Sequence, residues 1–188
     1  MRSLRIGAFA LAFALLIVAC SQGMTMQEYF SEMTKISGTQ KQQGDDLQSA
    51  ADKEISAAAD EATQLELIKS FFADSLKVAQ TALASVQDLS PPSDVEAEHK
   101  AFADAFQTLV GDLEEASASI ADASSGADVQ AVIQDVGTKI EQDSSKFDAA
   151  CADLQKAADD NKTEADLNCG GGSSSGSGDS GATPSPSP

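Results

Sequence analysis

The only histidine in the chain, His99, is the side chain best suited to acid–base or metal chemistry near neutral pH. It ends the stretch Glu96-Ala97-Glu98-His99, and the spacing Glu-x-x-His places a carboxylate and an imidazole on one face of a helix. Di-iron bundles need this spacing on two helices, which a chain with one histidine cannot supply. Glu96 also fits another role, as the acid of a capping box that starts at Ser93. We therefore expect no metal or other cofactor, and a structural His99 that donates a ring N–H to a backbone carbonyl or a carboxylate.

Methionine sulfur atoms offer a second set of ligands. Met24, Met26 and Met33 lie in or near the first expected helix, and together with His99 they would suit Cu(I). Methionines at such positions are more often core and linker residues. One alternative stays open, which is a small-ligand or metal site lined by His99, Tyr29 and Met33 where the first and third helices meet.

The N-terminal stretch MRSLRIGAFALAFALLIVAC has the parts of an export signal. Arg2 and Arg5 supply positive charge, and the apolar stretch that follows is shorter than the ~20 residues of a membrane-spanning helix. Its end, Ile17-Val18-Ala19-Cys20, resembles the bacterial lipobox. The resemblance implies cleavage before Cys20, attachment of diacylglycerol to its thiol, and acylation of the new amine, typically by palmitate. The alternative is an N-terminal membrane anchor that stays uncleaved.

A lipobox sets the location of the whole protein. Two or more acyl chains hold a protein durably on a membrane. We therefore expect a signal peptide at 1–19, and a lipoprotein bound through lipid on Cys20 to the extracytoplasmic side of a bacterial cell membrane. Only the short linker at 20–24 would separate the lipid from a helical body at 25–169.

The other two cysteines, Cys151 and Cys169, are expected to form a disulfide, because a leftover pair in an exported protein usually does. Neither sulfur has a basic neighbour that would lower its pKa, and the Cys-x-x-Cys spacing of redox enzymes is absent from the sequence. A disulfide would leave no free thiol to work with His99, and no spacing identifies an activated serine. We therefore expect no enzymatic activity.

The charge of the chain excludes one class of partner. Lys and Arg number 12 against 30 Asp and Glu, which gives a formal charge of −18, and both arginines lie in the expected signal peptide. A field this acidic repels phosphates, and a mature chain without arginine lacks their best ligand. We expect no nucleic-acid partner.

Apolar residues three and four positions apart predict four helices, over 26–59, 63–89, 94–123 and 128–160. Capping-box patterns mark three of the starts, at Thr25-x-x-Glu28, Thr63-x-x-Glu66 and Ser93-x-x-Glu96. The fold we expect is all-α, an antiparallel up-down-up-down four-helix bundle. Two features complicate it. Polar residues from Gln40 to Gly44 interrupt the first apolar stripe, and residues 57–63 contain neither Gly nor Pro. The alternative is therefore three long helices, one of them over 45–89, plus a short N-terminal helix.

Residues 170–188, GGGSSSGSGDSGATPSPSP, cannot form a core, and we expect a disordered spacer or solvated tail there.

Several short motifs follow one another along the expected mature chain: Glu28-Tyr29, Leu89 to Pro92, His99, Ala150 to Gln155 and Asp166 to Cys169. This order resembles a group of uncharacterised, exported helical lipoproteins of bacteria. The resemblance implies helices, an anchor and a disulfide, but no substrate and no catalytic residue. We expect a non-enzymatic binding or structural protein of the cell envelope, with another envelope protein as its partner. The alternative is a small-ligand or metal-binding lipoprotein that serves a membrane transporter.

Overall fold

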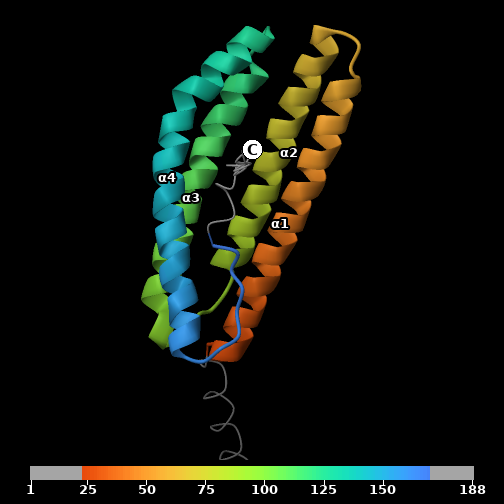
Figure 1. Ribbon diagram of the computed structural model, residues 1–188. Helices are drawn as coiled ribbons and strands as arrows, with labels where there is room; N and C mark the ends of the chain where they lie inside the picture. The colour runs from red at the N-terminus through yellow and green to blue at the C-terminus, as the bar shows by residue number, and fades with distance from the viewer. Residues whose placement is uncertain (1–22, 170–188) are drawn as a thin grey trace, which may run out of the picture.

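The computed structural model describes residues 23–169, and these form an antiparallel four-helix bundle (Figure 1). Its helices are α1 (Met26–Ala57), α2 (Glu61–Gln87), α3 (Glu96–Ala121) and α4 (Gly126–Asp160), with a 3₁₀ turn, η2 (Ser93–Val95), before α3. The helices pack in chain order, α1 on α2, α2 on α3 and α3 on α4. The all-α, up-down fold expected from the apolar stripes is confirmed. The expected signal peptide, Cys20 and the tail at 170–188 lie outside the described residues.

α1 and α2 are separate helices, so the alternative of one continuous helix over 45–89 is wrong. Ala58 leaves helical geometry with φ −67° and ψ 131°. Asp60 then caps α2, because its carboxylate accepts a hydrogen bond from the Thr63 N–H at 2.8 Å. An aspartate at this position satisfies one of the free N–H groups of the first turn. The break therefore needs neither Gly nor Pro.

Of the three predicted capping boxes, only the first is present. The Thr25 hydroxyl accepts from the Glu28 N–H, and the Glu28 carboxylate accepts from the Thr25 N–H at 2.9 Å. The box at Thr63 is wrong, because α2 begins two residues earlier and Thr63 donates to the cap. The box at Ser93 is also wrong, since no side-chain hydrogen bond caps η2 or α3. There the Val95 N–H donates to the Pro92 carbonyl, and this 3₁₀ turn precedes the helix.

The main core lies at the end of the bundle where α1 begins. All four helices contribute to it, and its most deeply buried large side chains are Tyr29, Phe30, Val86, Val95 and Leu154. A second, smaller cluster lies at the opposite end, between α2, α3 and α4, and consists of Leu65, Ile120, Ala123 and Val129. The two clusters hold the bundle at its two ends.

α1 and α4 make few direct contacts within the described part of the chain. Beyond Ser37 every side chain of α1 is exposed or half-buried, in agreement with the polar interruption of its apolar stripe at 40–44. Residues 161–169 instead cross from α4 towards α1 at the end where α1 begins (Figure 1). The Asp166 N–H donates to the Thr34 hydroxyl at 3.2 Å, and the Ser37 hydroxyl donates to the Asp166 carbonyl at 3.2 Å. An irregular segment therefore replaces helix–helix packing at this edge.

No helix among residues 23–169 is both long enough and apolar enough to cross a membrane.

Candidate functional site

His99 and Tyr29 meet in the main core. His99 lies in the first turn of α3 and Tyr29 in the first turn of α1, and Tyr29 Oη is 2.9 Å from His99 Nδ1. The two rings are in edge contact, with centroids 5.7 Å apart. Tyr29 is fully buried and His99 is 9 % exposed. His99 is therefore hydrogen-bonded within the fold, but its partner is a phenol and not the carbonyl or carboxylate that we expected.

Burial sets the protonation of this pair. It lowers the pKa of His99, which favours the neutral ring. It also raises the pKa of Tyr29, with a further contribution from the negative charge of Glu98. A protonated phenol then donates to Nδ1 of a neutral imidazole whose proton lies on Nε2, a tautomer assigned from these bonds. In this state the pair is a structural contact between α1 and α3.

The third candidate ligand, Met33, lies one turn after Tyr29 on α1 and is 2 % exposed in the same core. Tyr29 and Met33 thus belong to one core cluster, and His99 contacts that cluster through Tyr29. Met24 and Met26 pack against this cluster and are partly buried. Within residues 23–169 no group of three or more His, Cys, Asp or Glu side chains is placed to hold a metal ion.

Cys151 and Cys169 form a disulfide, as predicted, with their Cα atoms 5.5 Å apart. Cys151 is on α4 and is 1 % exposed, whereas Cys169 ends the segment that follows α4 and is half-buried. Gln155 holds the same segment, because its side-chain amide accepts from the Leu167 N–H and donates to the Ala165 carbonyl, each at 3.1 Å. The disulfide therefore closes the C-terminal segment onto the core.

Gly23 and Met24, the first described residues, lie against the connection between α2 and α3. The Met24 N–H donates to the Ser90 carbonyl at 3.1 Å. A Cβ atom added to Gly23 would lie 3.2 Å from the Pro91 carbonyl oxygen, which is closer than most side chains tolerate. Cys20 itself lies outside the described residues.

A shallow groove runs between α1 and α2, and sequence reasoning did not find it. It consists of two adjoining hollows of about 570 Å³ and 290 Å³, which share Gln43 and Thr81. Its other side chains are mostly polar or charged, including Lys35, Thr39, Gln40, Asp74, Lys77 and Ser85, above apolar contacts from Ile36, Leu47 and Val78. The polar stretch that interrupts the stripe of α1 was the signal available in the sequence.

No protein-family model, curated protein sequence or solved structure matches this chain. The similarity to exported helical lipoproteins therefore stays a prediction, and function has to be inferred from the residues themselves.

Proposed function

We propose that the protein is a lipid-anchored, non-enzymatic binding protein on the extracytoplasmic side of a bacterial cell membrane, attached through Cys20 and bound to another envelope protein. One observation carries the proposal: the side chains with the most reactive chemistry are used to build the fold. His99 is hydrogen-bonded to Tyr29 in the core, and Cys151 is bonded to Cys169. What the described surface offers is helical faces and the groove between α1 and α2.

The position of the predicted anchor supports a role at a distance from the membrane. α1 starts at Met26, shortly after Cys20, and Met24 is bonded to the connection between α2 and α3. α1 has 32 residues, which at 1.5 Å per residue span about 48 Å. A bundle anchored at the start of α1 therefore carries the groove outward along its length, where a partner could reach it.

The anchor is tested by growing cells that express the wild type or the Cys20→Ala variant with radiolabelled palmitate. We expect label in the wild type and none in Cys20→Ala, because the variant lacks the thiol that would carry the lipid and the residue that directs cleavage. Cys169→Ala is the matched control, since it also removes a cysteine but leaves the predicted lipid site intact. Absence of label from the wild type, or equal label in Cys20→Ala, would contradict the lipid anchor and favour the uncleaved N-terminal segment.

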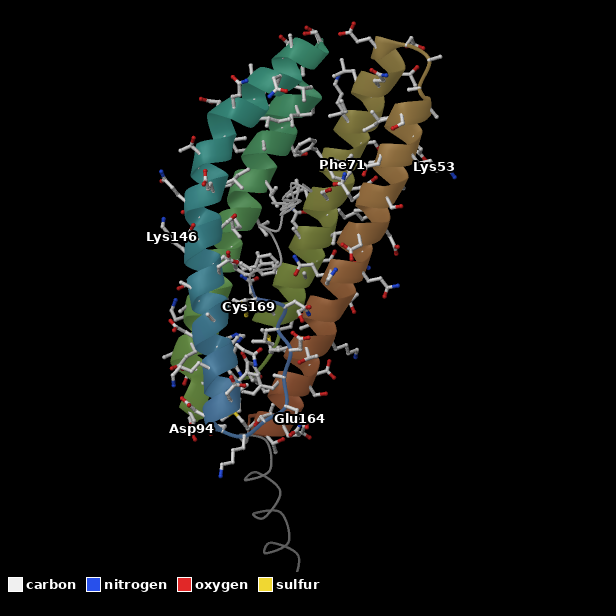
Figure 2. All side chains as sticks on the ribbon, in the orientation of Figure 1. Lys53, Phe71, Asp94, Lys146, Glu164 and Cys169 are labelled. Carbon is white, nitrogen blue, oxygen red and sulfur yellow. A yellow bond between two sulfur atoms is a disulfide. The ribbon has the colours of Figure 1, made fainter. Side chains whose placement is uncertain are left out.

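The binding role is tested by photocrosslinking on intact cells. A photoreactive amino acid at Gln43, which lines both hollows of the groove, should capture one envelope protein reproducibly. The control position is Lys53, which is on the same helix but outside the groove and points away from the bundle (Figure 2). Capture from both positions alike, or from neither, would count against the groove as the binding surface.

The alternative is a small-ligand or metal-binding lipoprotein that serves a membrane transporter. It is favoured by the contact of His99 with Tyr29, which belongs to the same core cluster as Met33. Its weakness is that a ligand would have to reach side chains buried in the core. Metal analysis of protein purified without chelators separates the two proposals. One metal ion per chain, lost in His99→Ala, would favour the alternative, and sub-stoichiometric metal would exclude its metal-binding form.

A further inference from the structure

The stretch from Glu164 to Cys169 lies along the edge between α1 and α4 without helix or strand of its own (Figure 2). The backbone hydrogen bonding that closes α4 ends with the Thr163 N–H, which donates to the Ala158 carbonyl at 2.9 Å. Between residues 23–169, no backbone–backbone hydrogen bond involves 164–169. Hydrogen bonds to the helices come instead from three side chains, Thr34, Ser37 and Gln155. A few side-chain contacts therefore hold this stretch in place.

The apolar contact of 164–169 with the bundle depends mainly on one side chain. Leu167 is 5 % exposed, whereas Ala165 and Cys169 are only partly buried against the main core. Every other buried residue of the main core lies on a helix or on η2. Departure of 164–169 would therefore uncover one edge of the main core and leave the packing of the four helices on one another in place.

The disulfide between Cys151 and Cys169 supplies the covalent attachment, and its two ends differ in exposure. Cys151 is 1 % exposed, and its Sγ is 3.9 Å from the Leu167 carbonyl oxygen. Cys169 is half-buried, so a thiol in solution reaches the bond from the Cys169 side. Disulfides that solvent can reach are more often labile or regulatory than fully buried ones.

The backbone at the two ends of this part of the chain is in the left-handed region, with φ 54° at Lys162 and φ 53° at Asn168. Residues other than Gly, Asn and Asp seldom adopt this region, so the conformation of Lys162 carries a cost. The closed position is thus held by one disulfide, a few side chains and Leu167, against an unfavourable backbone conformation.

We propose that residues 164–169 form a reducible strap, which a protein dithiol opens by reducing the bond between Cys151 and Cys169, and that opening uncovers the main core between α1 and α4 while the four helices stay folded. A second turn of the same chemistry in reverse, with a protein disulfide as oxidant, closes the strap again. The proposal does not depend on the lipid anchor or on a partner at the groove, so each can fail without the other.

The reduction is an exchange of thiols and disulfides. A thiolate of the dithiol attacks Sγ of Cys169, the bond to Cys151 breaks, and Cys151 leaves with the electron pair and takes up a proton. The second thiol of the reductant then attacks the mixed disulfide and displaces Cys169, which also takes up a proton. Two electrons and two protons have passed from the dithiol to this chain, and the reductant has become a disulfide.

The first test measures the equilibrium between oxidised and reduced protein, for the full chain in nonionic detergent, in mixtures of reduced and oxidised dithiothreitol. If reduction opens the strap, the two hydrogen bonds of Gln155 with the strap exist only in the oxidised chain. Gln155→Ala should then shift the equilibrium towards the reduced chain by about fivefold or more. Gln134→Ala is the matched control, because Gln134 is exposed on the same helix and precedes Cys151 by several turns, and it should cause no shift. An unshifted equilibrium for Gln155→Ala would overturn the proposal, because the strap would then stay closed after reduction.

The second test asks whether the strap opens in the folded bundle. Wild type reduced by dithiothreitol should keep its helical circular dichroism signal. Iodoacetamide should then alkylate Cys151 at a rate that does not change with urea below the unfolding transition, because opening exposes little surface compared with unfolding. Mass spectrometry of peptides assigns the label to Cys151. Loss of the helical signal on reduction, or alkylation of Cys151 that rises with urea in step with global unfolding, would overturn the proposal and make the disulfide a fixed part of the fold.

Discussion

At the scale of single residues, the contact between Tyr29 and His99 explains why a polar ring lies on an apolar stripe. The phenol and the imidazole each satisfy a polar atom of the other at 2.9 Å in the core. The apolar spacing was enough to place His99 in the interior. The sequence placed Tyr29 near His99 only in the alternative of a ligand site. Their direct hydrogen bond could not be predicted, because it depends on how the first turns of α1 and α3 face each other across 70 residues of sequence.

Replacement of His99 by Ala should destabilise the protein. The variant leaves the buried hydroxyl of Tyr29 without a partner, which costs about 1–3 kcal/mol, and it removes packing as well. Each kcal/mol lowers the melting temperature of a domain of this size by about 2–4 °C. Thermal unfolding followed by circular dichroism measures the shift. In the background of Tyr29→Phe the same substitution should cost less, and equal costs in both backgrounds would show that the hydrogen bond contributes nothing.

Acid should weaken the protein through the same pair. Burial holds the pKa of His99 below the value of 6.5 for a free imidazole, so the unfolded chain takes up this proton more readily than the folded one. The contribution of neutral His99 is complete above the unfolded pKa and decreases as the pH falls through it. The unfolding free energy of wild type relative to His99→Phe should therefore decrease from about pH 7 to about pH 5. A constant difference over this range would contradict the assignment.

At the scale of the helices, the sequence predicted the presence and the order of the four helices better than the residues at which they begin and end. Periodicity located all four helices, because a stripe of buried side chains persists over many turns. The ends depend on single caps, and the start of α2 shows the difficulty. Asp60 and Thr63 are both good capping residues, and only the backbone shows that Asp60 accepts from Thr63. Asp112 on α3 and Asp143 on α4 are only 3 % and 7 % exposed, and the sequence did not predict their burial, because an aspartate in a helix is normally exposed.

The two candidate caps of α2 can be separated by mutation. Asp60→Ala should lower the unfolding free energy by about 1 kcal/mol, because the first turn loses its acceptor. Thr63→Ala should cost clearly less, since the Thr63 backbone N–H that donates to Asp60 remains. Urea unfolding of the two variants side by side measures the difference. A larger loss for Thr63→Ala would show that the cap lies where the sequence pattern placed it.

At the scale of the whole molecule, the bundle is closed at one edge by a segment without helical structure. Residues 161–169 bond to Thr34 and Ser37 of α1 and to Gln155 of α4, and they bury Leu167 to 5 % exposure. The composition of α1 explains the need for such a segment, because few of its side chains could pack on α4. The pairing of Cys151 with Cys169 was predictable from cysteine count, but the role of the segment between them was not.

Loss of the disulfide should therefore loosen the edge between α1 and α4 as well as lower overall stability. The bond joins residues 18 positions apart, and closure of a loop of this length contributes about 3 kcal/mol in the chain-entropy model. In the double variant Cys151→Ala, Cys169→Ala we expect faster amide hydrogen exchange at 163–169 and in the first turns of α1, where Thr34 and Ser37 lose their partners. Amide exchange in the second apolar cluster should become faster only by the amount that the loss of global unfolding free energy explains.

Ser37→Ala provides the control, because it removes two hydrogen bonds to the segment, one with Asp166 and one with Asn168, but keeps the disulfide. It should accelerate amide exchange near Asp166, but it should lower the global unfolding free energy much less than loss of the disulfide does. If the double variant instead exchanges uniformly faster along all four helices, the segment has no local role, and the disulfide acts only by restricting the unfolded chain. A selective effect at 163–169 and α1 would mean that the non-helical segment completes the main core at the end of the bundle where α1 begins.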